Sequence, residues 1–305
     1  MKAFILRRVL QLFITLFVFL TIMFFLVRVT GNPAEAFAPT DATPEDIKRI
    51  AAGMGLDRPL YVQYVLYLKD ILTGSFGQSH KSLRPVSDLL VIHSLNTMKL
   101  AAVSAIISTL IAIPLGVIAA IKRFTLIEAL IRLIAVFGMS VPGFWMGIIL
   151  IEQFAVKLGL LPAGGMAGPG SYILPAITMS TLLIAGLVRL LRSSMIDTLD
   201  SDFVRFARMK GIRRRSLIWK HTLRNALLPV MGFAGVQIAM FLTGSVVVET
   251  VFAWPGLGRL MYTALIERDL PVVQGCVTLF VFFAIFINLV VDVLSSYLDP
   301  RIRLG

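Results

Sequence analysis

Six long apolar runs constrain the fold of this chain more than any other feature. A helix needs roughly 20 residues to cross the hydrocarbon core of a bilayer, and each run has about that length. One such run could be the buried helix of a soluble protein, but six of them predict an all-α, polytopic membrane protein with six transmembrane helices. The runs are Val9–Val27, Leu100–Ile121, Leu133–Val156, Ile173–Leu191, Val230–Val248 and Val272–Val291.

Composition agrees with this interpretation. The chain is 57% hydrophobic and 15% charged, and its mean hydropathy is +0.87. The first run follows a basic start, as a signal peptide would, but its apolar part exceeds the roughly 7–15 residues typical of a signal-peptide core. We therefore expect Val9–Val27 to be an uncleaved transmembrane helix.

The positive charges predict the orientation. With the N-terminus in the cytoplasm, 18 of the 29 Lys and Arg residues fall on the cytoplasmic side, in short loops and at the ends of the runs. This asymmetry follows the positive-inside rule and predicts that both termini lie in the cytoplasm. The net charge of +12 then needs no nucleic-acid partner.

The segments outside the runs are very unequal. We expect a first helix within residues 1–29, an extracytoplasmic lobe over residues 30–98 and a transmembrane core over residues 99–305, with a cytoplasmic loop at 194–228. Within the lobe, Thr43 precedes a helix-forming stretch that Gly55 ends. A second helical stretch places Tyr61, Val65 and Leu68 on one face.

Several kinds of chemistry are missing from the sequence. It has no phosphate-binding loop of the Gly-x4-Gly-Lys-Ser/Thr type, so we expect no ATP bound by this chain and no enzymatic activity. The histidines His80, His93 and His221 are far apart in the sequence, which argues against a metal site. Cys276 is the single cysteine, so no internal disulfide can form.

A few polar residues interrupt the apolar runs. Gln237 could line a polar path or make a hydrogen bond between helices, and Ser140 and Asn288 are further candidates for path lining. Glu249 and Asp292 are expected at the membrane interface, solvated by water and headgroups. Pro114 and the pair Pro142-Gly143 break backbone hydrogen bonds inside the second and third runs and predict kinks there.

The most basic segment, ARMKGIRRRSLIWKH, lies between the fourth and fifth runs. Acidic residues from Asp200 to Asp202 favour a helix start, Phe203, Phe206 and Met209 form an apolar stripe, and Gly211 favours a turn. A second basic helix is expected over Arg213–Ala226. The stripe could lie on lipid headgroups or in a groove of another protein; nucleic acid is the least favoured partner, because both ends of the loop are held at the bilayer.

At this loop the sequence resembles a family. Arg205-Phe206-Ala207-x3-Gly211 is similar to the Glu-Ala-Ala-x3-Gly loop of ABC-type importer permeases, and HTLRNALLPV resembles the peptide/nickel subgroup. Arg205 and Phe206 depart from Glu-Ala. Further similar stretches extend over nearly the whole chain: GNPAEAF, GLDRPLYVQY, GSFGQS, RPVSDLL, MSVPGFW, VVVETVFAWPGLGRL, RDLPVVQG and LDPRIR. The long lobe resembles the B-type permease of a pair.

The resemblance implies a type I importer permease fold, a location in the bacterial inner membrane and a set of partners. These are a second homologous permease, two cytoplasmic subunits that bind ATP and Mg²⁺, and an extracytoplasmic solute-binding protein. It implies that the loop holds a helix that docks on an ATPase, formed by Asp202, Phe203, Arg205, Phe206, Ala207, Arg208, Met209, Lys210, Gly211 and Ile212. It also implies binding-protein contacts in the lobe and the WPGLG segment, for which the candidates are Tyr61, Gln63, Phe76, Trp254 and Pro255.

The transported solute stays open among the classes that the subgroup handles. We favour dipeptides or oligopeptides, with nickel or a metal chelate, glutathione and opine-like compounds as alternatives. Two other classes of protein remain. An ion-coupled secondary carrier would need an ion site in the middle of the membrane, and a receptor or scaffold would move no solute.

Overall fold

A computed structural model describes residues 2–29, 34, 42–53 and 55–298, and this part of the chain is almost entirely helical. The all-α prediction is confirmed. Five helical stretches are long and apolar enough to cross a membrane, and one bent pair of helices could supply a sixth crossing. The five longest helices are α1 (Lys2–Val29), α5 (Val86–Ile121), α8 (Ile173–Leu199), α11 (Leu223–Gly244) and α14 (Leu270–Leu298).

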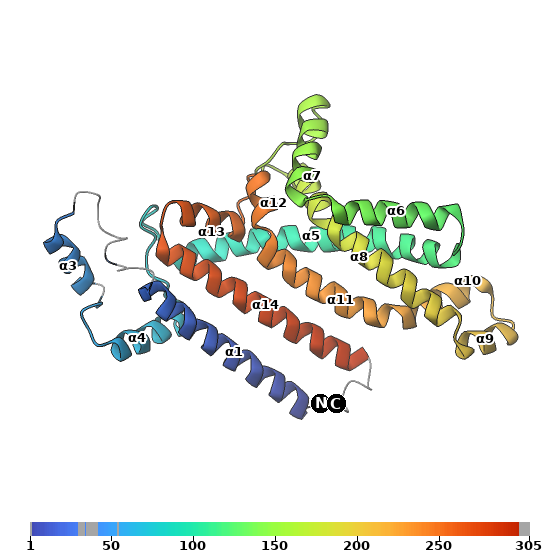
Figure 1. Cartoon of the computed structure of the whole chain (residues 1–305), viewed down its shortest axis with the longest axis horizontal. Coiled ribbons are helices and arrows are strands. Elements are labelled where there is room, and N and C mark those ends of the chain that lie inside the picture. The colour runs from blue at the N-terminus through green and yellow to red at the C-terminus, as the bar shows by residue number, and fades with distance from the viewer. Residues whose placement is uncertain (1, 30–33, 35–41, 54, 299–305) are drawn as a thin grey trace.

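These helices lie side by side and contact one another through small residues (Figure 1). A Cβ atom added to Gly116 of α5 would lie 2.9 Å from Leu191 of α8, and one added to Gly186 of α8 would lie 2.5 Å from Phe233 of α11. A Cβ atom added to Gly235 of α11 would likewise overlap the side chain of Val291 in α14. Glycine permits such close backbone approach, which is how membrane helices gain van der Waals contact without a hydrophobic driving force.

The third apolar run is bent at Pro142-Gly143, where the sequence predicts a kink. It forms α6 (Leu126–Ser140), α7 (Gly143–Leu150) and the π-helix η1 (Ile151–Lys157), with a bend of 102° between α6 and the rest. Val141 adopts an extended backbone because the residue before a proline is disfavoured in the helical region. Pro142 therefore breaks the run, and α7 projects away from the bundle (Figure 1).

The two ends of the bundle differ. Figure 1 shows α3 (Pro44–Gly53), α4 (Leu60–Leu72) and α13 (Leu257–Ile266) towards one end, which we call the lobe end. The other end, the basic end, carries α9 (Asp202–Met209) and α10 (Arg214–Ser216). The first residues of α5 belong to the range 30–98 that was assigned to the lobe, so the second long helix continues into it.

The lobe helix α4 is fixed to α1 by polar and aromatic contacts. Both Nε and Nη2 of Arg28 donate to Oε1 of Gln63, at 3.1 and 2.8 Å, and the Gln63 amide donates to the carbonyls of Leu56 and Arg58. The rings of Tyr64 and Tyr67 pack against Phe24, at centroid distances of 5.1 and 5.4 Å.

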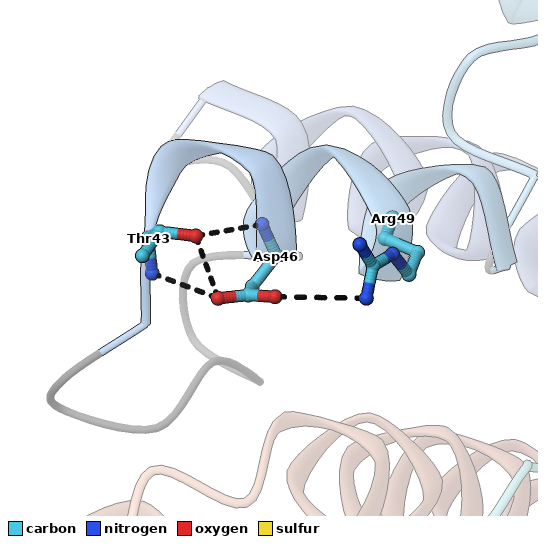
Figure 2. Close-up of polar contacts among 3 residues, drawn as sticks. All are labelled: Thr43, Asp46 and Arg49. Carbon is cyan, nitrogen blue, oxygen red and sulfur yellow. Dashed lines mark hydrogen bonds and ion pairs between the residues drawn. The ribbon is translucent and has the colours of Figure 1, made fainter.

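The start of α3 carries the cap that the sequence predicts (Figure 2). The Thr43 hydroxyl donates to Asp46 Oδ2 at 2.6 Å and accepts from the Asp46 amide at 3.3 Å, while the Thr43 amide donates to the same carboxylate. Arg49 lies 3.8 Å from the other carboxylate oxygen. These hydrogen bonds hold the pKa of Asp46 below its usual value. The capping prediction is confirmed, and Gly55 has the left-handed backbone expected of a helix stop, with φ +68°.

Two stretches that carry the family resemblance fall largely outside the described residues. They are GNPAEAF, of which Ala34 alone is described, and LDPRIR, of which only its first residue is described. The side chain of Asp292 is outside them as well.

Candidate functional site

The predicted docking helix exists as α9, and its ends are set by local sequence. Ser201 has the extended backbone of an N-cap, and Asp202 in the first turn complements the helix dipole. At the other end, the Gly211 amide donates to Arg208 O and the Ile212 amide to Ala207 O. Gly211 has φ +76°, and this pair of bonds is a Schellman motif that ends the helix and turns the chain.

The α9 helix presents three different faces. Val204 and Ala207 are buried in a small apolar cluster with Leu217, Leu199 and Ile212. The stripe is exposed: Phe203, Phe206 and Met209 have exposed fractions of 45%, 61% and 73%. The third face carries two arginines, Arg205 and Arg208. The predicted stripe is therefore free to contact another surface, while Ala207 and Ile212 hold the helix in place.

A cavity of about 620 Å³ lies beside the arginine face of α9. Its wall includes Arg123, Asp200, Arg205, Arg208 and Arg214, with apolar residues from the ends of α5 and α8. The Arg123 guanidinium donates to the Asp200 carboxylate at 2.8 Å, which joins the turn after α5 to the end of α8.

A second ion pair joins α6 to α8 at the basic end. Arg192 lies 2.5 Å from Glu128, whose other carboxylate oxygen accepts the Phe124 amide at 2.6 Å. Because the Glu128 side chain is buried, this pair is shielded from solvent and fixes the turn between α5 and α6 against α8. Together with the Arg123–Asp200 pair, it attaches the elements around α9 to the bundle.

The chain returns from α9 to the bundle without the separate helix that the sequence had suggested over Arg213–Ala226. Helical backbone continues from α10 through the π-helix η3 (Leu217–Thr222) into α11 and passes Pro229. Within η3 the Thr222 hydroxyl donates to Leu217 O at 2.9 Å. A π-helical turn often marks a functional position, and this one lies between α10 and the transmembrane helix α11.

At the lobe end, Glu249 of α12 (Val246–Val251) is the centre of a buried network. Its side chain is 0% exposed. The carboxylate accepts hydrogen bonds from Thr97 Oγ1 at 2.6 Å, Ser245 Oγ at 2.8 Å and the Arg259 amide at 3.0 Å. Our expectation of a solvated Glu249 at the interface was wrong. The WPGLG segment folds over the carboxylate, and Gly256 leaves room for it, because a Cβ atom there would overlap Glu249.

The same network fixes the segment that holds Trp254. The Trp254 indole donates to Asn96 O at 3.1 Å, and the Asn96 amide donates to Pro255 O at 3.0 Å. Trp254 is fully buried and Gln63 nearly so, so their side chains are not available to a binding protein, contrary to the sequence-based assignment. Of the other candidates, Tyr61 is exposed, while Phe76 and Pro255 are half-buried.

The three candidates for path lining are in different surroundings. Gln237 lines a cavity of about 210 Å³ between α6, α7, α8 and α11, together with Thr178 and Thr181, and makes no hydrogen bond within the described part of the chain. Ser140 donates to Val136 of its own helix at 2.9 Å, and Asn288 is exposed on α14. The structure does not bring these residues together.

Comparison with known proteins identifies the family. Residues 112–304 match the family described as "binding-protein-dependent transport system inner membrane component", and residues 1–95 match the N-terminal family of the same transport-system membrane components. The chain belongs to this family. It is an ABC importer permease, and the resemblance given by the sequence motifs is confirmed.

Individual relatives agree with this assignment. The permease is 39% identical over 304 residues to the glutathione transport system permease protein GsiC of Escherichia coli K12, covering 99% of both chains. It is 40% identical to the protein of the same name from Salmonella typhimurium, with the same coverage.

Solved structures confirm the fold. The inward-facing MetNI methionine ABC transporter matches with a TM-score of 0.60 at 18% identity, over 69% of the permease and 96% of that chain. A solved structure described as an amino acid ABC transporter with histidines matches with a TM-score of 0.56 at 14% identity, over 69% and 94% of the two chains. Since both identities are low, these likenesses concern the fold alone.

Proposed function

We propose that this permease forms half of the pathway of an ATP-driven importer and couples to a partner ATPase through α9. The main observation is the exposed stripe of Phe203, Phe206 and Met209 on a helix whose opposite face is buried against the bundle. Exposed apolar side chains at helical spacing fit a groove on another protein. A helix fixed by Val204, Ala207 and the Gly211 turn would pass a displacement on to α8, which ends beside it, and through η3 to α11.

The proposed orientation places the basic end in the cytoplasm and the lobe end outside, in the bacterial inner membrane. The charge distribution supports this, because Lys and Arg gather around α9 and α10 and at the turn after α5. The ATP-hydrolysing subunits would then meet α9, and the solute-binding protein would meet the lobe around Tyr61. A second, homologous permease would supply the other half of the pathway. The exposed apolar face of α6, which includes Leu133 and Phe137, is open to such a partner or to lipid.

For the solute we propose a short peptide, with glutathione as the first compound to test. The support is that the two relatives described above are named for glutathione transport. Dipeptides remain our broader expectation from the sequence. The cavity beside Gln237, Thr178 and Thr181 is the proposed polar part of the pathway, since it lies between helices on both sides of the bend at Pro142.

The test is transport by the reconstituted complex of permeases, ATPases and binding protein. Phe206→Asp places a charge on the docking stripe, so we expect ATP-driven uptake of labelled glutathione to fall at least tenfold while the amount of permease in the membrane stays the same. Gly211→Pro, which removes the turn that ends α9, should uncouple hydrolysis from uptake.

Phe124→Asp is the matched control, because Phe124 is also exposed at the basic end but lies outside α9. Unchanged uptake in the Phe206→Asp complex would refute the docking role. Uptake without ATP would instead support the ion-coupled carrier. ATP-driven uptake of dipeptides but not of glutathione would refute only the proposed solute.

A further inference from the structure

The cavity at the basic end has more positive than negative side chains in its wall. Four guanidinium groups belong to its wall, those of Arg123, Arg205, Arg208 and Arg214, against the single carboxylate of Asp200. Asp200 is already paired with Arg123, and Arg205 lies 3.5 Å from the exposed Asp202. Arg208 and Arg214 have no ion pair within the described part of the chain. The guanidinium groups of Arg208 and Arg214 are therefore the positive charges of the wall that an anion in the cavity would neutralise.

The cavity lies apart from the surface proposed for ATPase docking. Residues three apart on a helix lie nearly above one another, so Arg205 and Arg208 form one row and Phe203, Phe206 and Met209 form another. The arginine row belongs to the wall of the cavity, and the apolar row does not. Docking of the stripe would therefore leave the arginine row unused, although the family resemblance had suggested that both rows meet the ATPase.

The depth of the cavity indicates the kind of anion. Its wall includes Ala120 and Ile121, which are the last residues of both α5 and the second apolar run. The ends of transmembrane helices lie where the apolar core of a bilayer meets its headgroups, and basic pockets between such ends bind phospholipid headgroups. Arginine matches phosphate geometry through paired N–H donors.

We propose that this cavity is a binding site for a phosphate-bearing anion, and that the headgroup of an anionic phospholipid is its source. Arg208 and Arg214 bind the phosphate, Arg123 is shared between the phosphate and Asp200, and the apolar wall accepts the start of the acyl chains. A bound headgroup joins α9 to the ends of α5 and α8. The site does not depend on the docking of an ATPase and is distinct from it.

Native mass spectrometry of the purified full-length permease tests this inference. The probes are phosphatidylglycerol, phosphatidylcholine as the lipid without net charge, and inorganic phosphate. We expect tighter binding of phosphatidylglycerol than of phosphatidylcholine, and about 20-fold weaker binding of phosphatidylglycerol in the double variant Arg208→Gln/Arg214→Gln. The matched control Arg213→Gln/Arg215→Gln removes the same charge from the same segment outside the cavity wall and should leave binding within about twofold.

A variant with the opposite sign separates binding from damage to the fold. Asp200→Asn removes the one carboxylate, so phosphatidylglycerol should bind several-fold more tightly. If inorganic phosphate binds through the same arginines and no lipid preference appears, the phosphate site is supported but its ligand is a soluble phosphate and not a lipid headgroup. Equal losses in the two double variants, or no change in either, would overturn the site. Displacement of phosphatidylglycerol when the ATPase subunits are added would also overturn it, because an acidic protein segment would then be the occupant.

Discussion

The lobe end and the basic end use charged groups in opposite ways. At the lobe end the Glu249 carboxylate is fully buried and accepts three hydrogen bonds from Thr97, Ser245 and the Arg259 backbone. At the basic end Arg208 and Arg214 are exposed around a cavity, and the stripe beside them is apolar and exposed. The lobe end satisfies the Glu249 carboxylate internally, whereas the basic end, beside its own ion pairs, leaves Arg208 and Arg214 for a partner. Substitutions should therefore cost stability at the lobe end and function at the basic end.

The largest effect is expected from Glu249→Ala. This change leaves three buried donors without an acceptor, so we expect a loss of roughly 3 to 5 kcal/mol in the free energy of unfolding. Thermal unfolding of the purified permease in detergent measures it. Glu152→Ala is the control, since Glu152 is exposed and its partner Lys157 lies at the surface. Equal unfolding temperatures for the two variants would contradict the comparison.

In the middle of the bundle, between the two ends, we expect a substitution to cause an intermediate loss of stability. A Cβ atom at Gly235 would overlap the side chain of Val291, whereas a Cβ atom at Gly232 of the same helix would meet nothing within 4 Å. We expect Gly235→Ala to destabilise the permease by about 1 to 3 kcal/mol through overpacking. Gly232→Ala should leave stability unchanged or raise it slightly. The same unfolding assay distinguishes them, and equal stability would show that α11 and α14 can separate at no cost.

A smaller, local effect is expected at the exposed start of α3, where the helix α3 can be compared with α13 at the same end of the bundle. Thr43→Ala removes the cap in Figure 2, so the amides of α3 should exchange hydrogen about fivefold faster, while those of α13 stay unchanged. Because the pKa of Asp46 is lowered in the folded state, the cap is fully formed above the ordinary pKa of aspartate and is lost as the pH falls through the lowered value. Hydrogen exchange of the whole permease measures both effects. Uniform protection in wild type and variant would contradict the capping role.

The smallest effect on stability is expected from Phe206→Ala. This side chain is 61% exposed, so its removal should change the unfolding temperature very little, although we expect uptake by the complex to fall. Val204→Ala on the buried face of the same helix is the matched variant and should lower the unfolding temperature measurably. If Phe206→Ala destabilised the isolated permease more than Val204→Ala, the stripe would be part of the fold and not a docking surface.

The sequence by itself determined the elements that depend on neighbours along the chain. The apolar runs specified the long helices, Thr43 specified the start of α3, and Gly211 specified the end of α9, because each signal lies within a few residues of its effect. The stripe on α9 was also visible in the sequence, since helical spacing follows from the helix alone.

Only the tertiary structure decided which polar and aromatic residues are buried. The sequence alone suggests that Glu249 lies at the membrane interface, but its carboxylate is buried and accepts a hydrogen bond from Thr97, which is 152 positions away. Trp254 and Gln63 looked available to a partner, but the Asn96 backbone and Arg28 occupy their polar atoms. The size of the bend at Pro142 and the gathering of Arg123, Arg208 and Arg214 around one cavity likewise depend on packing between distant segments. A pattern along the chain specifies a helix, but the neighbours of that helix are set by contacts that no local pattern contains.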